Sequence, residues 1–417
     1  MNNLGLSYAT DMHATYTPKL LDTIQACPAA DWNDLLDADE TQAGRVFVRH
    51  EFLAALEDTH CVGEKTGWIP QHLTLWRNHP ENHSQTLVAA CPLYLKLHSY
   101  GEYVFDWGWA EAYQRHGLDY YPKLLCAIPF TPVRGPRLLA RDAEARQALL
   151  ETLLSVARQN QVSSVHLLFP PNAQTTLLRD EGLLMRDSVQ FHWRNQGYRH
   201  FEDFLQALNK KKRKNIRQER RHAAELGLRY EHVPGRQATP QDWEVFYACY
   251  ARTYYEHRSQ PYLNAIFFQR WAQHLPDNLH LIFAARETAH GTTRIAAVLL
   301  VVDRTATEPT AYGRYWGALE HHPFLHFEMA YYQSLEYCIA QGIQRFEGGA
   351  QGEHKLARGF LPESLHSAHW LAQPEFSEAV AEFLAREHAG MQHYLDELNE
   401  RAPIKTQHTP TFDKPIS

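Results

Sequence analysis

The chain has 417 residues, of which 44% are hydrophobic and 21% charged, and its formal net charge is −7. This length predicts two folded domains, and the composition excludes a disordered or fibrous chain. The acidic balance excludes a general nucleic-acid binder, which would carry a broad positive field. No stretch approaches the roughly 18 apolar residues that a membrane span needs, and the first residues show no signal-peptide pattern. We therefore expect a cytoplasmic protein without a membrane span.

Cysteine and histidine usage gives no sign of a metal site. The six cysteines are widely spaced, form no CxxC pair and in several cases lie inside apolar runs. Buried free thiols in a reducing compartment are therefore expected rather than disulfides. The 26 histidines follow no zinc motif. Their densest group, His321, His322 and His326, is better explained by loop or cleft positions, so no metal is expected.

The first domain is expected to span residues 1–190 and to mix helices with strands, because apolar residues change between helical and alternating spacing. Its predicted elements are a helix at 51–59, strands at 72–77 and 87–98, an aromatic-rich loop at 100–139, a helix at 144–160, a strand at 163–169, a short helix near 175–182 and a strand region at 185–195. As a group, the loop's polar and aromatic residues could form an acceptor-binding cleft, although any single ring could fill core instead. These cleft candidates are Asp106, Trp107, Tyr120, Tyr121 and Lys123.

The second domain, residues 191–373, repeats this order of elements, which suggests two copies of one fold. Thr239 is a predicted N-cap before Pro240, and Gly342 is a predicted C′ residue. The predicted elements are helical residues 198–227, a strand at 228–235, helices at 239–258 and 263–275, strands at 279–287, 294–304 and 311–318, a helix at 324–342, and strands at 343–349 and 367–373. A C-terminal helix is expected at 374–400 and a flexible tail at 401–417.

The stretch "NKKKRKNIRQERR", residues 209–221, stands out in an acidic protein. Eight of the twelve residues from Lys210 onward are Lys or Arg. Cations at a helix start oppose the helix dipole and repel one another, and a bound phosphate would relieve both effects. We therefore expect helix 210–226 to face the cleft between the domains and to bind a phosphate. Its candidate contacts are Lys211, Lys212, Arg213, Asn215 and Arg217, while a solvated helix face or pairing with distant acidic residues stays open.

Several blocks resemble those of a known family. The segments "FDWGWAEAY…YYPKLLCAIPFTPVRGPRLL", "GRYWGA…FLHFEMAYYQ" and "FEGGAQGEHKLARGF" are similar to those of a bacterial FemAB-like N-acyltransferase family, associated with peptidoglycan biosynthesis or recognition. The basic helix is similar to the Lys/Arg-rich signature at the start of that family's second domain. The resemblance covers about residues 47–370. It implies an α/β (α+β) protein with two tandem GNAT-like acyl-CoA N-acyltransferase domains, each a mixed central sheet flanked by helices.

The resemblance also implies where the acyl donor binds. In GNAT folds two neighbouring parallel strands part, and the donor enters the gap; here those strands would be "AYGRYWGA" and "IQRFEGG". The usual acetyl-CoA loop, R/Q-x-x-G-x-G/A, has no counterpart in "GALEHHPFLHF". Because FemAB relatives lack that loop and use aminoacyl-tRNA, both acyl-CoA and aminoacyl-tRNA stay open as co-substrates. No tightly bound cofactor is expected.

Two segments flank this gap and offer the candidate chemistry. Amide formation needs a base to take the amine proton and a donor to stabilise the oxyanion. We expect Glu347 or His354 as the base and Arg314 as the anion or oxyanion contact. Tyr315 is a further catalytic candidate, and because Tyr315 and Trp316 alternate faces on the strand, only one of them can point into the cleft. Further donor-binding candidates are His322, Gly348, Gly349 and Lys355.

The leading hypothesis is thus an N-acyltransferase that moves an acyl or aminoacyl group to an amine of a small molecule or peptide. No nucleophile motif such as GxSxG is present, which favours direct attack without a covalent enzyme intermediate. tRNA is a partner if it carries the donor group. The alternative is a non-catalytic module that binds a phosphorylated cell-wall precursor or RNA. The sequence leaves the oligomeric state open.

Overall fold

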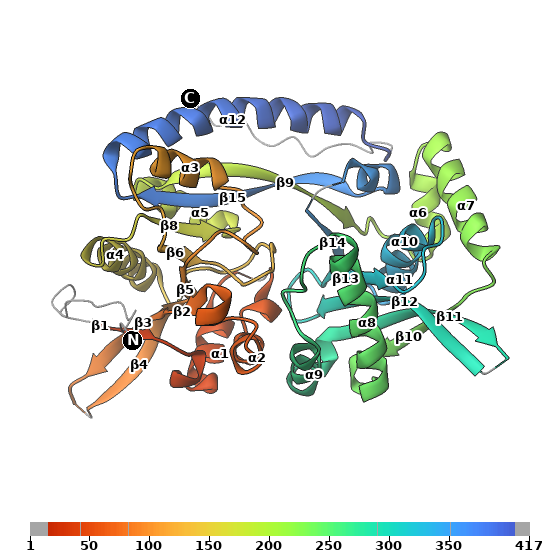
Figure 1. The fold of residues 1–417 in the computed structure, drawn as a ribbon, viewed down its shortest axis with the longest axis horizontal. Coiled ribbons are helices and arrows are strands. Elements are labelled where there is room, and N and C mark those ends of the chain that lie inside the picture. The colour runs from red at the N-terminus through yellow and green to blue at the C-terminus, as the bar shows by residue number, and fades with distance from the viewer. Residues whose placement is uncertain (1–15, 42, 82, 290, 351, 405–417) are drawn as a thin grey trace.

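A computed structural model describes residues 16–404 except 42, 82, 290 and 351. Its centre is an eleven-stranded sheet in the order β10-β11-β12-β13-β14-β9-β15-β8-β6-β5-β2, which runs through both halves of the molecule (Figure 1). A four-stranded sheet, β1-β3-β4-β7, belongs to the first half. No helix of the described residues is long and apolar enough to cross a membrane. The six cysteines are free and buried, as expected.

The elements follow the predicted mixture of helices and strands. The first half contains β1 (Tyr16–Leu21), α1 (Ala29–Ala38), α2 (His50–Asp58), β2 (Trp68–Pro70), β3 (His72–His79), β4 (Ser84–Cys91), β5 (Leu93–Lys96), α3 (Trp107–Arg115), β6 (Lys123–Cys126), β7 (Leu139–Ala140), α4 (Ala143–Gln159), β8 (Ser164–Leu168), α5 (Asn172–Asp180) and β9 (Leu184–Arg194). The segment 100–139, predicted as a loop, therefore contains a helix and two strands. The many aromatic residues of this segment obscured the helical spacing of apolar residues in α3.

The second half begins with two helices and ends with a long one. It contains α6 (Phe201–Ala207), α7 (Lys210–Ala224), β10 (Arg229–Pro234), α8 (Pro240–Glu256), α9 (Ala265–His274), β11 (Leu279–Thr288), β12 (Gly291–Asp303), β13 (Thr310–Ala318), α10 (Leu325–Phe327), a π-helical segment (Glu328–Gln333), α11 (Ser334–Ala340), β14 (Arg345–Ala350), β15 (Leu361–Leu371) and α12 (Pro374–Glu400). Thr239 caps α8 in a capping box, and Gly342 follows α11 with a φ of 66°, so both predicted helix ends are confirmed. Of the predicted tail, residues 405–417 lie outside the described residues.

Two strands belong to both halves. β9 pairs with β15 along most of its length and with β14 at its C-terminal end, and β15 also pairs with β8. β15, although late in the sequence, thus lies inside the sheet of the first half. β9 crosses the expected domain boundary at residues 190–191. A division into 1–190 and 191–373 stays a prediction, because the sheet is continuous there.

The halves also share a hydrophobic core. Phe52 of α2 packs edge-on against Phe267 and Trp271 of α9, with ring centroids 5.7 and 4.9 Å apart. Phe47 lies 5.1 Å from Tyr312 of β13. Aromatic contacts of this kind stabilise beyond the area that they bury. The two halves are therefore one packed body, and α12 crosses both along the top of Figure 1.

The close packing of α8 on β13 generates a first prediction. Gly317→Ala should lower the free energy of unfolding by about 1–3 kcal/mol, the range for overpacking, because an added Cβ would lie 1.8 Å from the Cys249 carbonyl oxygen. Gly390→Ala in α12 is the matched control, since its Cβ would meet nothing within 4 Å. Chemical denaturation measures both variants, and equal stabilities would contradict the packing described.

Candidate active site

The candidate site lies where β13 and β14 part. These parallel strands pair only from Thr310 to Tyr312 and from Arg345 to Glu347. Beyond that point a cavity of about 490 Å³, here called the gap cavity, is lined by residues of both strands. Gly313 permits the arrangement, because a Cβ there would lie 2.7 Å from the Phe346 ring. These are the two strands that the family resemblance indicated.

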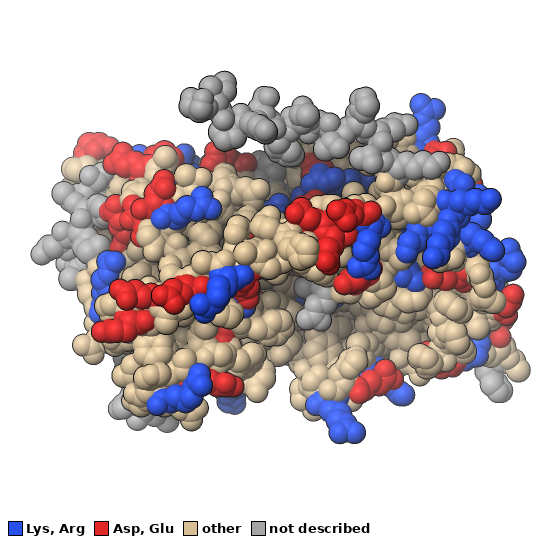
Figure 2. Space-filling model, turned by 90° about the horizontal axis from the view of Figure 1, so that it is seen from above, with Lys and Arg blue, Asp and Glu red and all other residues tan. Residues whose placement is uncertain are grey.

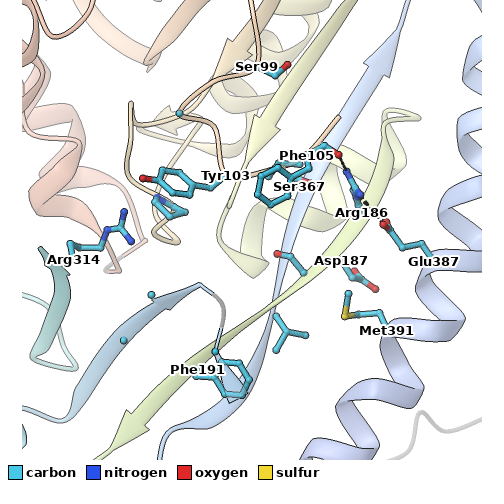
Figure 3. Close-up of a pocket in the computed structure, with 18 of the residues that line it drawn as sticks. Ser99, Tyr103, Phe105, Arg186, Asp187, Phe191, Arg314, Ser367, Glu387 and Met391 are labelled. Atoms are coloured by element: carbon cyan, nitrogen blue, oxygen red, sulfur yellow. Dashed lines mark hydrogen bonds and ion pairs between the residues drawn. The ribbon is translucent and has the colours of Figure 1, made fainter. Parts of the chain in front are cut away.

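A larger cavity of about 850 Å³, here called the central cavity, lies between the halves. Figure 3 shows Arg314 on one side of it and Asp187, Glu387 and Met391 toward the other. Its walls come from the 99–107 segment, β9, β13, β14, β15 and α12. The residues that line both the gap cavity and the central cavity are Gly313, Arg314 and Gly348.

Arg314 occupies this junction. The β12–β13 register skips it, pairing Leu299 with Tyr315 and Leu300 with Gly313, so Arg314 forms a bulge that redirects its side chain. Its Nη2 donates to the Phe130 carbonyl oxygen at 3.1 Å, and its guanidinium lies 5.6 Å from the Tyr103 ring. Its Nε has no hydrogen-bond partner among the described residues. Because Arg314 lines both cavities, its guanidinium can contact an anion or an oxyanion there.

Three polar groups face the gap cavity beside Arg314. The Lys355 side chain is buried and its Nζ donates to the Gly349 carbonyl oxygen at 3.0 Å. Burial, with the Arg314 guanidinium nearby, lowers the pKa of Lys355 to about 8. Burial, with Arg358 and Lys355 nearby, also lowers the pKa of His354. The His354 Nε2 and the Tyr331 hydroxyl are hydrogen-bonded at 2.9 Å. The site thus joins a neutral imidazole to a phenol.

Two expected catalytic residues are placed differently. Glu347 is 1% exposed and lines neither cavity; its carboxylate lies 3.2 Å from Arg345 and 3.9 Å from His192. Since Phe346 and Gly348 face the gap, strand alternation turns Glu347 to the opposite side, which corrects the expectation of a base there.

Tyr315 borders the gap cavity, but its ring packs into the core. Its centroid lies 5.9, 5.4 and 6.3 Å from those of Tyr250, Phe268 and Trp271. Trp316, on the other face of β13, lies 5.1 Å from His326. The Tyr315 ring therefore packs into the core at the edge of the gap cavity, and its catalytic role stays a prediction.

Most of the expected acceptor residues form a buried network behind the central cavity. Lys123 is fully buried and donates to Ser99 at 2.7 Å, to Glu102 at 2.8 Å and to Asp106. The Tyr120 hydroxyl donates to Asp106 at 2.7 Å. Burial tends to raise the pKa of Asp106, but the ammonium of Lys123 holds that pKa well below its usual range. Burial raises the pKa of Glu102 to about 7.

Only one of the five acceptor candidates lines the central cavity. That residue is Trp107, whereas Tyr121 reaches the wall indirectly through a 2.8 Å hydrogen bond to Ser99. The remaining three were expected in the cleft because they are polar. A buried ammonium needs carboxylate partners, and the network of Lys123 meets this need instead.

The basic helix α7 lies at the outer end of the second half and lines neither cavity (Figure 1). The expectation that it faces the cleft between the domains is therefore corrected. Arg217 pairs with Glu202, and Arg213 donates to Gln206 at 2.8 Å. Lys211 and Lys212 have no such partner among the described residues, and Figure 2 shows blue side chains gathered at this end.

One face of α7 adjoins the segment before α10. Asn215 and His222 line a hollow of about 210 Å³ together with Phe324, and the His222 and Phe324 rings stack at 5.4 Å. Nearby in sequence, His322 bonds to Glu320 at 2.9 Å and lines neither large cavity. The helix thus stands beside the gap-cavity half of the site, on the side away from the first half.

The sequence did not point to Tyr331 or Asp187. Tyr331 lies in a π-helical segment, which has no sequence periodicity of its own, and was assigned only to a helix. Asp187 lies in β9 and lines the central cavity. A lone acidic residue within the strand region expected at 185–195 was the one available signal for it.

Comparison with known proteins agrees with this geometry. A family profile named FemAB_like, described as peptidoglycan biosynthesis/recognition, matches residues 23–406. The chain belongs to this FemAB-like family. No curated protein sequence matches it.

The chain is also similar, at low identity, to several solved structures. FemX is 9% identical with a TM-score of 0.50, covering 85% of this chain and 98% of its own. L-PGS from Bacillus licheniformis is 10% identical with a TM-score of 0.48, covering 85% and 96%. A tandem GNAT protein from the clavulanic acid pathway is 13% identical with a TM-score of 0.44, covering 86% and 99%. The mixed α/β fold of a FemAB-like protein, which was expected from the sequence, is thus confirmed by the family profile and by FemX.

The junction generates a prediction about Lys355. Its ammonium should titrate near pH 8, well below ordinary lysines, when followed by NMR of lysine labelled at Cε. Lys355→Arg, by removing one signal, assigns the resonance. Arg314→Met should raise this pKa, because a nearby positive charge that disfavours the ammonium is gone. A midpoint above pH 10 in the unmodified protein would contradict the burial described here.

Proposed function

We propose that this FemAB-like protein is an N-acyltransferase that transfers an acyl or aminoacyl group from acyl-CoA or aminoacyl-tRNA directly to an amine. The observation that carries the proposal is that the gap cavity and the central cavity meet at Gly313, Arg314 and Gly348. A donor in the gap and an acceptor in the central cavity would present their reacting atoms to each other there. Holding two reactants in this way supplies much of the rate enhancement of a transferase.

The polar groups at the junction suit amide formation. The neutral amine attacks the acyl carbonyl carbon, a C–N bond forms, and the C–S bond of a thioester or the C–O bond of an aminoacyl ester breaks. His354, neutral because its pKa is lowered, takes the amine proton. Tyr331 protonates the leaving sulfur or oxygen and regains a proton from His354 through their hydrogen bond. Arg314 and the Lys355 ammonium stabilise the oxyanion.

The donor leaves the gap on the side of α10 and α7. An acyl-CoA or a tRNA acceptor end is longer than the gap cavity, so its phosphates extend beyond it. The lysines of α7 that have no partner among the described residues suit such phosphates. This placement keeps the expected phosphate role of the basic helix but moves it from the interdomain cleft to the donor side. Six buried free thiols fit a cytoplasmic enzyme.

His354→Gln should lower kcat by about 100- to 10,000-fold, the usual contribution of a general base, with donor binding retained. His393→Gln, on the exposed face of α12, is the matched control and should leave kcat unchanged. The assay is transfer from CoA thioesters, and then from charged tRNA, to a panel of amines, with donor binding followed by isothermal titration. Donor binding without any transfer would favour the non-catalytic binding module, and neither binding nor transfer would overturn the enzyme.

Lys211→Ala combined with Lys212→Ala should weaken donor binding about tenfold at low salt, with less effect at high salt because phosphate contacts are screened. Lys65→Ala combined with Arg179→Ala removes the same charge from exposed positions of the first half and should leave the donor Kd unchanged. Titrations with a CoA thioester and with aminoacyl-tRNA at two salt concentrations distinguish the donors. An unchanged Kd in the α7 variant would make the helix a solvated face.

A further inference from the structure

The charges that line the central cavity are not all neutralised within the protein. Three acidic residues, Asp187, Glu353 and Glu387, line it together with Arg186 and Arg314. Both carboxylate oxygens of Glu387 accept from Arg186 at 2.8 Å, as Figure 3 shows, which cancels that pair. Glu353 accepts from Arg401 at 2.9 Å. Among the charged residues that line the cavity, Asp187 and Arg314 are therefore the two that no Lys, Arg, Asp or Glu of the described residues neutralises.

Asp187 has only imidazole partners. Its Oδ1 accepts from His366 at 2.8 Å and its Oδ2 accepts from His388, and no Lys or Arg of the described residues pairs with it. These hydrogen bonds hold the pKa of Asp187 below its usual value, so the carboxylate stays ionised. Its side chain is 9% exposed. A largely buried carboxylate that no Lys or Arg of the described residues pairs with, in the wall of a cavity, is a site for a cation.

The rim of the same cavity is aromatic and exposed. Tyr100 and Phe105 are each 59% exposed and Trp107 is 37% exposed, and all three belong to one segment of nine residues that lines the cavity. Exposed aromatic clusters mark binding surfaces, and their faces attract both alkyl chains and cations. An anionic ligand, such as a phosphorylated precursor, would instead meet the carboxylate of Asp187, which no Lys or Arg of the described residues pairs with.

The two ends of the cavity treat an amine differently. Beside Arg314 and Lys355 a bound amine loses its proton more readily, because the neighbouring positive charges disfavour the ammonium form. Beside Asp187 an amine stays charged. A ligand with an amine at each end would therefore bind with one of them ready for attack and the other held as an ammonium.

We propose that the central cavity binds acceptors with two amino groups on a flexible aliphatic chain, one held as an ammonium by Asp187 and the other at the Arg314 junction. A free diamine or polyamine and an amino-terminal lysine residue of a peptide share this chemistry. Acylation of the second amine rests on the proposed function: its nitrogen bonds to the acyl carbon, and its proton reaches the leaving group through His354 and Tyr331. Binding of the ligand does not rest on that function.

The test is isothermal titration of the full chain, without donor, with cadaverine, pentylamine and lysinamide. Cadaverine should bind at least tenfold more tightly than pentylamine, which has the same chain but a single amine. Asp187→Asn should remove that difference, while Asp180→Asn, an equal charge change at an exposed position of α5, should keep it. Thermal unfolding verifies that each variant is folded. If Asp187→Asn does not fold, the relative affinities of cadaverine and pentylamine for the unmodified protein still test the proposal.

Equal binding of cadaverine and pentylamine, no binding of either, or an unchanged ratio in folded Asp187→Asn would overturn the proposal. Tighter binding of cadaverine than lysinamide identifies a free diamine, and the reverse identifies a lysine residue; both support the proposed chemistry. Transfer to monoamines and diamines at equal kcat/KM, with equal binding, would refute this inference and leave the acyltransferase standing. Diamine binding that depends on Asp187, without transfer from any donor, would support this inference and refute the acyltransferase.

Discussion

The parting of β13 from β14 is the constraint on which the rest of the site depends. Parallel pairing ends after Tyr312 and Glu347 because Phe346 fills the space beside Gly313 and the next residue of β13 bulges out. The backbone groups freed by this parting line a cavity instead of a sheet. Breaks in strand pairing are often found next to active sites, so this break supports the site proposed here.

The site is held in place by elements from distant parts of the sequence. β14 pairs with β13 at its start and with β9 on its other side, and β9 pairs with β15. The walls of the central cavity are thus fixed to the same sheet as the gap. An aromatic core shared by α2 and α9 packs the two halves against each other.

Local features of the fold were predictable from the sequence, whereas long-range pairing was not. The bounds of α12, the capping box at Thr239 and the pair of strands that form the gap all follow from spacing, capping chemistry and the family blocks. The position of β15 between β9 and β8 could not be predicted, because the alternation of residues along a strand does not indicate which strand it pairs with.

The site was predictable by segment but less so by residue. Arg314, Gly348, His354 and Lys355 were expected and do line the cavities. Alternation indicated that neighbours on a strand face opposite sides, but not which side is the core, and Glu347 was placed on the wrong one. The unpaired charge of Asp187 depends on residues far away in the sequence, so no local pattern could reveal it.

The position of β15 has a consequence for biosynthesis. As the ribosome releases the chain, β8 and β9 emerge long before residues 361–371, which must lie between them. Until then each strand presents an open edge that other nascent chains could pair with. The first half therefore cannot complete its sheet during synthesis, and its final folding step awaits almost the whole polypeptide. Splitting the gene between the halves would leave a first half that cannot complete its own sheet.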